Sequence, residues 1–276
     1  MISALDRYNN VTQRVITGTV GIMAIVFAVY NGEWTYFALF FGICGLTQLE
    51  FYKLTGLDGM LPLKSVGTFT GLLLFTVSFL VERGTIDASY YLLVFPVTAS
   101  IFFIKLYKKS DKKPFTNIAF TLCGIIYVAV PFALLNLIAF SGNVYSFQIV
   151  LGILSLFWAS DTGAYFAGVR FGRRQLFARV SPKKSWEGSI GGAVTALVAA
   201  LVLSYFYTDL PAWEWIVVGA IIVVTGTYGD LVESLFKRSI AIKDSGSGLP
   251  GHGGFLDRFD GLLLASHFII VFLKFF

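Results

Sequence analysis

Long stretches without charged residues constrain this chain of 276 residues more than any other feature. Each stretch is close to the ~20 residues that a helix needs to cross about 30 Å of hydrocarbon. The runs are continuously apolar, whereas the strands of a membrane barrel alternate over about ten residues. The sequence therefore predicts an all-α polytopic integral membrane helix bundle. Its nine transmembrane helices are expected at about 12–30, 34–52, 62–82, 89–107, 116–139, 146–168, 188–207, 213–236 and 259–276.

The composition agrees with a membrane protein and disfavours a soluble one. Charged residues make up 13% of the chain and apolar residues 56%, whereas a soluble domain carries about 25% charged residues. The two cysteines, Cys44 and Cys123, lie within expected spans and have no metal-binding spacing. We interpret them as small packing residues.

The basic residues fall almost entirely on one side of the expected spans. Of the 21 Lys and Arg residues, only Arg83 and Lys274 fall on the other side. The positive-inside rule then places the N-terminus in the cytosol and the C-terminus outside. We therefore expect a multi-pass protein of the cell (plasma or inner) membrane, with an active site that faces the cytosol. The net charge of +5 follows from this topology, and no nucleic-acid partner is expected.

The ionisable residues within spans divide the chain into two parts. Residues 1–145, with about five spans, have few of them, and Glu50 near a cytosolic span end is weak evidence of function. Residues 146–276, with about four spans, form the expected catalytic part. A carboxylate at membrane depth costs several kcal/mol unless it is paired, so each one there is a functional candidate. These candidates are Asp161, Asp230, Glu233, Asp257 and Asp260.

One polar cluster lies within the sixth expected span, and a second lies directly before the seventh. Residues 158–165 read WASDTGAY, and they suit either a functional site at Asp161 or a helix packing seam with one hydrogen-bonded aspartate. Residues 181–188 read SPKKSWEG, in which Ser181 is expected to cap a helix. Helix amides together with Lys183 and Lys184 suit a phosphate. A positive-inside signal alone would also explain the two lysines.

The third cluster is the most informative and covers residues 229–260. Asp230, Glu233 and Lys237 share one helical face, and Asp257 and Asp260 lie three residues apart. Carboxylates without Cys or paired His favour Mg²⁺ or Mn²⁺ over zinc. Carboxylates that hold Mg²⁺ beside Lys and Arg are typical of phosphoryl or nucleotidyl transfer.

Residues 234–260 read SLFKRSIAIKDSGSGLPGHGGFLDRFD, which closely resembles the signature of the phosphatidate cytidylyltransferase (CDP-diacylglycerol synthase) family. The segments SDTGAY at 160–165 and SPKKSWEG at 181–188 also resemble that family, although Ser185 stands where threonine is more usual. The resemblance is strong over about 155–265. It implies transfer of the cytidylyl group from CTP to phosphatidate, which yields CDP-diacylglycerol and pyrophosphate. It also implies a divalent metal, in a centre that could be paired, and a homodimer in the lipid bilayer.

The expected roles of the site residues follow from the clusters and this resemblance. Asp230 and Asp257 are the leading Mg²⁺ ligands, and Asp260 and Asp161 are second choices. Lys237 and Arg238 are expected to hold phosphates, as catalytic residues together with Asp230 and Asp257. The residues expected to bind substrate are Ser181, Lys183, Lys184, Lys243, Asp244, His252 and Arg258.

Two other functions remain open at this point. A CTP-dependent lipid kinase, such as a polyprenol kinase, would transfer the γ-phosphate and leave CDP. A cation-coupled transporter would also use carboxylates within the membrane. A transporter favours polar groups near the midplane of both halves, whereas the carboxylates of this sequence cluster in one half and near one face.

Overall fold

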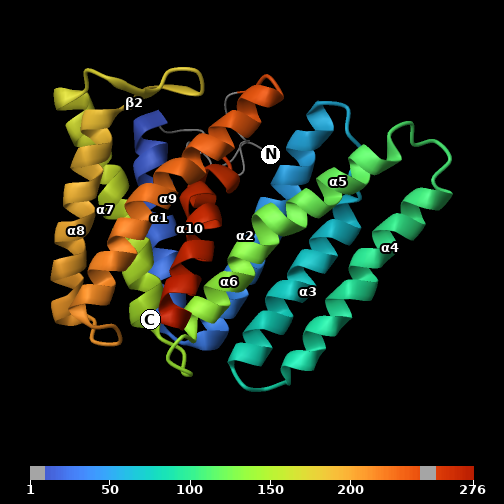
Figure 1. Ribbon diagram of the computed structural model, residues 1–276, viewed down its shortest axis with the longest axis horizontal. Coiled ribbons are helices and arrows are strands. Elements are labelled where there is room, and N and C mark those ends of the chain that lie inside the picture. The colour runs from blue at the N-terminus through green and yellow to red at the C-terminus, as the bar shows by residue number, and fades with distance from the viewer. Residues whose placement is uncertain (1–9, 243–252) are drawn as a thin grey trace. The chain divides into compact units, whose positions relative to one another are not determined.

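The computed structural model describes residues 10–242 and 253–276, and most of these residues lie in helices, with one short hairpin (Figure 1). A helix lies near each of the apolar runs. The α-helices are α1 (Asn10–Tyr30), α2 (Glu33–Leu57), α3 (Lys64–Glu82), α4 (Val94–Tyr107), α5 (Pro114–Gly124), α6 (Val130–Ala139), α7 (Phe147–Phe171), α8 (Trp186–Phe206), α9 (Ala212–Ser239) and α10 (Leu256–Phe275). The remaining elements are the 3₁₀ helix η2 (Ala88–Leu93), the π-helical turn η3 (Ile125–Ala129), and the strands β1 (Gln175–Phe177) and β2 (Ser181–Ser185).

Six helical segments of the described residues are long and apolar enough to cross a membrane. The outer face of α8 shows why a membrane suits them, because Ile190, Val194 and Val198 recur at helical spacing and are exposed. The chain is therefore treated as a multi-pass membrane protein, while its nine spans and their orientation stay predictions. The six segments are Lys64–Glu82, Ala88–Tyr107, Pro114–Ala139, Phe147–Phe171, Trp186–Phe206 and Ala212–Ser239.

The chain forms two compact units. The first contains residues up to Ala133 together with Ile240–Phe259, and the second contains Leu134–Ser239 and Asp260–Phe276. The helix α10 therefore begins in the first unit and continues in the second. The expected division near residue 145 stays a prediction.

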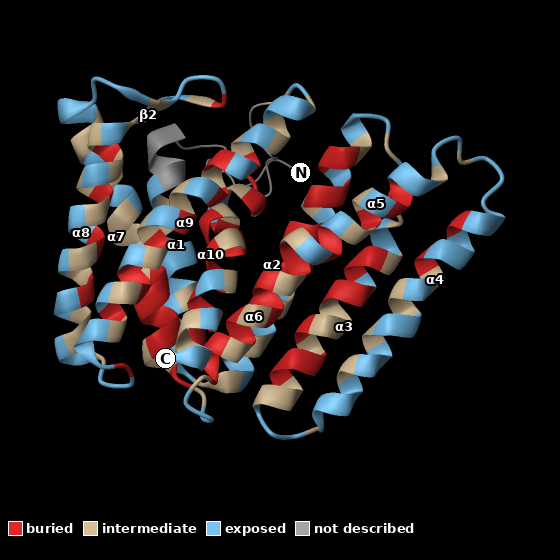
Figure 2. Ribbon diagram, viewed as in Figure 1, coloured by how far each residue is buried: buried red, intermediate tan, exposed pale blue. Residues whose placement is uncertain are grey.

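Side chains of α2 hold the first unit together through hydrogen bonds to backbone carbonyls. The hydroxyl group of Tyr52 donates to the carbonyl of Thr121 over 2.8 Å, and the amide of Gln48 donates to the carbonyls of Gly67 and Gly124. Figure 2 shows many buried residues on α2 and α3, whereas α4 buries only Ile101 and Lys105. The core of this unit therefore lies around α2, α3 and α5.

Lys105 was expected only as a basic residue near the membrane surface, but it is buried in a polar network. Its ammonium group lies 2.5 Å from the Asp111 carboxylate and donates to the carbonyl of Leu61 over 2.6 Å. Asp111 also accepts hydrogen bonds from the Asn117 side chain and from the Lys113 backbone. Pairing both charges in this way offsets the cost of removing them from water. The network fixes the connection between α4 and α5.

In the second unit, α7, α8 and α9 lie side by side (Figure 1). The seam between α7 and α8 consists of small residues, as in many membrane helix pairs. A Cβ atom on Gly163 would lie 2.9 Å from the carbonyl oxygen of Gly191, and one on Gly191 would lie 2.2 Å from the Cβ of Ala167. Gly163 of the SDTGAY segment therefore serves helix packing. This supports the interpretation of part of that segment as a packing seam.

The hairpin and the start of α8 correct one expectation. Ser181 does not cap a helix, because it lies in β2, which pairs with β1 in antiparallel fashion. Ser185 caps α8 instead, and its hydroxyl oxygen accepts a hydrogen bond from the Gly188 amide over 3.1 Å. The pairing with β1 keeps the Ser-Pro-Lys-Lys segment extended, so the helix begins four residues later than Pro182 suggests.

Candidate active site

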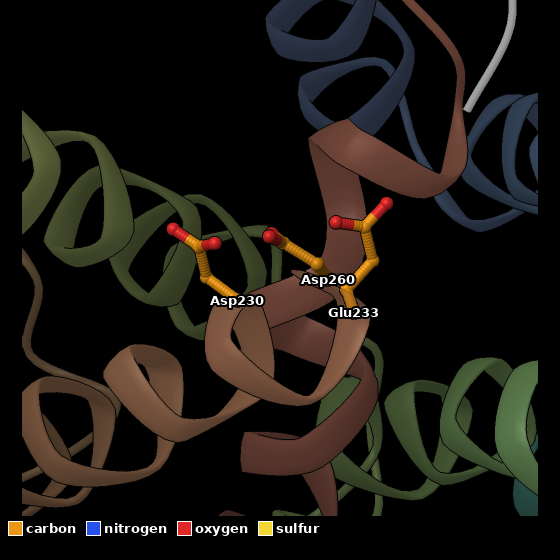
Figure 3. A group of neighbouring side chains, drawn as sticks. All are labelled: Asp230, Glu233 and Asp260. Atoms are coloured by element: carbon orange, nitrogen blue, oxygen red, sulfur yellow. The ribbon is translucent and has the colours of Figure 1, made fainter. Parts of the chain in front are cut away.

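Three carboxylates come together where α9 lies beside α10 (Figure 3). Asp230 and Glu233 lie on successive turns of α9, and Asp260 projects from α10 between them. One oxygen from each carboxylate lies within 4.8 Å of the others. Close approach of the helices makes this possible, because a Cβ atom on Gly229 would lie 2.5 Å from the carbonyl oxygen of Asp260.

Two lysines compensate two of these carboxylates. The ammonium group of Lys184, at the end of β2, pairs with Asp230. That of Lys237 lies 2.5 Å from the Glu233 carboxylate, one turn along α9. The first pair is partly exposed, with side chains 28% and 39% accessible, whereas the Glu233 side chain is only 1% accessible. The site therefore combines an accessible ion pair and a buried one.

Two further residues that the sequence predicted for the site, Asp161 and Lys184, lie near Asp260. Asp161 on α7 and Lys184 on β2 both lie close enough to act electrostatically on the Asp260 carboxyl, as does Asp230. The Ser234 hydroxyl donates to Asp230 over 3.2 Å. Residues from all three sequence clusters therefore lie close together in the second unit. They surround α9 and Asp260, the residue of α10 at which the second unit resumes.

The other predicted residues are placed less centrally. Asp257 opens α10 within the first unit, and its carboxylate accepts a hydrogen bond from the Gly254 amide over 3.3 Å. Lys183, Arg238 and Arg258 are exposed, and Ser181 is partly buried. Lys243, Asp244 and His252 lie outside the described residues.

Two features of the structure lie beyond the sequence interpretation. Glu233 was placed on the face of Asp230 but was not assigned as a ligand, although its carboxylate belongs to the three-membered group. Glu187 accepts hydrogen bonds from the backbone amides of Arg173 and Arg174, over 3.0 to 3.3 Å. It thereby ties the chain after α7 to the start of α8. The i, i+3 spacing was the signal for Glu233, whereas nothing local marks Glu187.

The residues of this group fit a hard divalent cation. All donors are carboxylate oxygens, which Mg²⁺ and Mn²⁺ prefer. With all three carboxyl groups and both lysines ionised, the group carries a net charge of −1, which favours a cation electrostatically. Asp230, Glu233 and Asp260 would hold it.

The helices are long and apolar enough for a membrane, and a cluster of carboxylates and lysines lies at their ends. These features define a membrane protein with a polar site suited to binding phosphates. The comparisons with known proteins give the family. The family model described as the cytidylyltransferase family matches residues 12–276, so the chain belongs to this family.

Relatives named phosphatidate cytidylyltransferase match this chain, two of them over nearly its whole length. The protein from Haemophilus influenzae is 34% identical over 94% of this chain and 97% of its own length. The protein from Bacillus subtilis is 31% identical over 96% of this chain and 98% of its own length. One from Staphylococcus aureus is 40% identical over 54% of this chain and 56% of its own length.

Proposed function

We propose that this chain transfers the cytidylyl group from CTP to phosphatidate, which yields CDP-diacylglycerol and pyrophosphate. The observation that carries the proposal is the family match over residues 12–276, together with the full-length relatives of that name. The carboxylate and lysine cluster supports it, because the reaction brings two polyanions together.

The chemistry needs cations more than it needs a base. The phosphate of phosphatidate has a second pKa of about 6, so it is largely dianionic at pH 7 and already nucleophilic. One of its oxygens attacks the α-phosphorus of CTP, and the bond from that phosphorus to the bridging oxygen of pyrophosphate breaks. The barrier comes from charge repulsion and misalignment, which placed cations reduce.

Lys184 and Lys237 are the cations that the structure places next to the carboxylates. We assign them to the substrate phosphates, with the exposed Arg238 and Lys183 as further contacts. If Asp230 and Glu233 held a divalent ion, the two ammonium groups would be available to phosphate oxygens. In this role the lysines keep the carboxylates compensated until substrate arrives.

Mg²⁺ is the proposed cofactor, and it would neutralise phosphate charge and polarise the α-phosphoryl group. Asp230, Glu233 and Asp260 are its proposed ligands in the second unit. Asp257 and Asp161 remain proposed ligands from the sequence, and a paired metal centre would accommodate more than three carboxylates.

The proposed location is the cytosolic face of a plasma or inner membrane, with nine spans and a cytosolic N-terminus. The distribution of Lys and Arg supports this orientation, since 19 of the 21 lie on one side of the expected spans. The acyl chains of phosphatidate can then stay in the bilayer while its phosphate meets the site. The homodimer is part of the proposal and is tested by light scattering of the purified protein in detergent.

Release of pyrophosphate tests the proposal. Purified protein in detergent with CTP, Mg²⁺ and phosphatidate should release pyrophosphate only when phosphatidate is present. A matched reaction with diacylglycerol, which lacks the nucleophilic phosphate, should release none. Appearance of CDP in place of pyrophosphate would instead indicate a CTP-dependent lipid kinase. If no CTP is consumed, the assignment as a cytidylyltransferase fails.

A further inference from the structure

Glu50 is a carboxylate of α2 that the proposed chemistry does not use. It accepts hydrogen bonds from the backbone amides of Phe255, over 2.8 Å, and of Leu256, over 3.4 Å. These partners lie more than 200 residues further along the chain, but Glu50 and both amides belong to the first compact unit. The contact therefore links the first half of the chain to the start of α10.

The first turn of a helix requires such partners. Its amides have no acceptor within the helix, and they carry the positive end of the helix dipole. Glu50 satisfies the amides of Phe255 and Leu256, while Asp257 accepts a hydrogen bond from Gly254. Hydrogen bonds to a charged acceptor are stronger than neutral ones. Together the two carboxylates fix the direction in which α10 starts.

We propose that Glu50 is a positioning residue that anchors the first turn of α10 and thereby places Asp257, which lies in that turn, for catalysis. Asp257 belongs to the first turn of α10 and to the same compact unit as Glu50. The inference rests on the proposed function, because Asp257 is a proposed metal ligand of the reaction. A positional error of about 1 Å at such a site can cost about a hundredfold in rate.

Two substitutions separate positioning from a direct chemical role. Glu50→Ala removes both acceptors, whereas Glu50→Gln keeps one carbonyl oxygen for the Phe255 amide. A positioning role predicts that glutamine restores much of what alanine loses. If Glu50 instead bound a metal ion or moved a proton, glutamine would be as damaging as alanine.

Glu33→Gln is the matched control, because Glu33 lies on the same helix and also bears a hydrogen bond. It accepts from the Arg83 side chain over 2.6 Å at the opposite end of α2. That pair is about one-third exposed, so its loss should matter little for stability.

The test combines hydrogen–deuterium exchange with turnover, on the full-length protein in detergent. Exchange is followed in a peptide that contains Phe255 and Leu256. We expect faster exchange there in Glu50→Ala, with turnover roughly ten- to hundredfold lower at saturating CTP and phosphatidate. Glu50→Gln should lie between Glu50→Ala and wild type in both measurements, and Glu33→Gln should match wild type.

Unchanged exchange in Glu50→Ala overturns the anchoring, and faster exchange with wild-type turnover overturns its catalytic importance. If Glu50→Ala does not fold, the Glu50→Gln variant tests the positioning role. Unchanged exchange with lost turnover in Glu50→Gln would contradict that role. Faster exchange with partly lost turnover would support it. Exchange requires no substrate. If wild type makes no CDP-diacylglycerol, the proposed function fails, while the exchange still supports or refutes the anchor.

Discussion

Lys184 of the β-hairpin forms an ion pair with Asp230 of α9. The hairpin thus contributes a cation to a group of carboxylates that belongs to the neighbouring helices. The lysines of the SPKK segment had two interpretations, a phosphate site or a signal for membrane orientation. The pairing favours a role in the site for Lys184, and that role can be tested separately from topology.

Replacing Lys184 with glutamine should lower turnover at least tenfold, because a cation next to the reacting phosphates is lost. Stability should change little, since the Lys184 and Asp230 side chains are 28% and 39% exposed. Steady-state kinetics and thermal unfolding in detergent measure the two effects. Lys109→Gln is the matched control, an exposed lysine on the same predicted side of the membrane. If Lys184→Gln keeps full activity as that control does, the lysine is only an orientation signal.

Removing a carboxylate from the three-membered group should weaken the binding of a divalent cation. We expect Asp260→Asn to bind Mn²⁺ at least tenfold more weakly than wild type, because one of three ligands loses its charge. Electron paramagnetic resonance of free Mn²⁺ measures this without substrate. Asp87→Asn, which alters only the cap of η2, should bind Mn²⁺ as wild type does. Equal affinities in all three proteins would remove Asp260 from the metal site.

The buried pair of Lys237 and Glu233 predicts a strong dependence of stability on both partners. Lys237→Met should lower the free energy of unfolding by about 3–5 kcal/mol, because it removes an ammonium group that lies beside a buried carboxylate. The double variant Glu233→Leu, Lys237→Met should recover most of that loss. Chemical denaturation in mixed micelles gives both values. A double variant no more stable than Lys237→Met would show that the pair does not act as a unit.

Asp111 predicts how stability responds to acid. Its hydrogen bond with Lys105 is the main cause that holds the pKa of the Asp111 carboxyl below its ordinary value, and hydrogen bonds from Lys113 and Asn117 act in the same direction. A carboxyl with a lowered folded-state pKa stabilises the fold above its unfolded pKa of about 4. That contribution is lost as the pH falls through the folded-state value.

Asp111→Asn should therefore be less stable than wild type at pH 7, and the difference should shrink as the pH falls below about 4. Melting temperatures of both proteins between neutral and acid pH provide the measurement. A difference that stays constant with pH would contradict the lowered pKa of Asp111.

The positions of the helices could be predicted from the sequence because each apolar run must form a hydrogen-bonded helix in lipid. The grouping of Asp230 and Asp260 was also accessible, since carboxylates are costly within apolar runs and carry their own signal. The spacing of Glu233 from Asp230 pointed to the same face. The sequence was informative where a residue type in its own segment carried a physical reason.

Contacts between distant segments could not be predicted in this way. Glu50 acquires its role from amides more than 200 residues away, and in its own helix it reads as a snorkelling side chain. Lys105 likewise looks like a surface charge until Asp111 and Leu61 enclose it. Ser181 was misjudged because Ser-Pro before a polar segment suits a helix cap, while the pairing of β2 with β1 depends on a strand six residues earlier.

Transfer of label from CTP to lipid tests the central proposal most directly. Purified protein is incubated in micelles with phosphatidate, Mg²⁺ and CTP labelled at the α-phosphorus, and the lipid phase is then extracted. The account predicts label in the lipid phase, as CDP-diacylglycerol, with one pyrophosphate released for each labelled lipid. Label that remains in water-soluble CDP, or CTP that is not consumed, would contradict it.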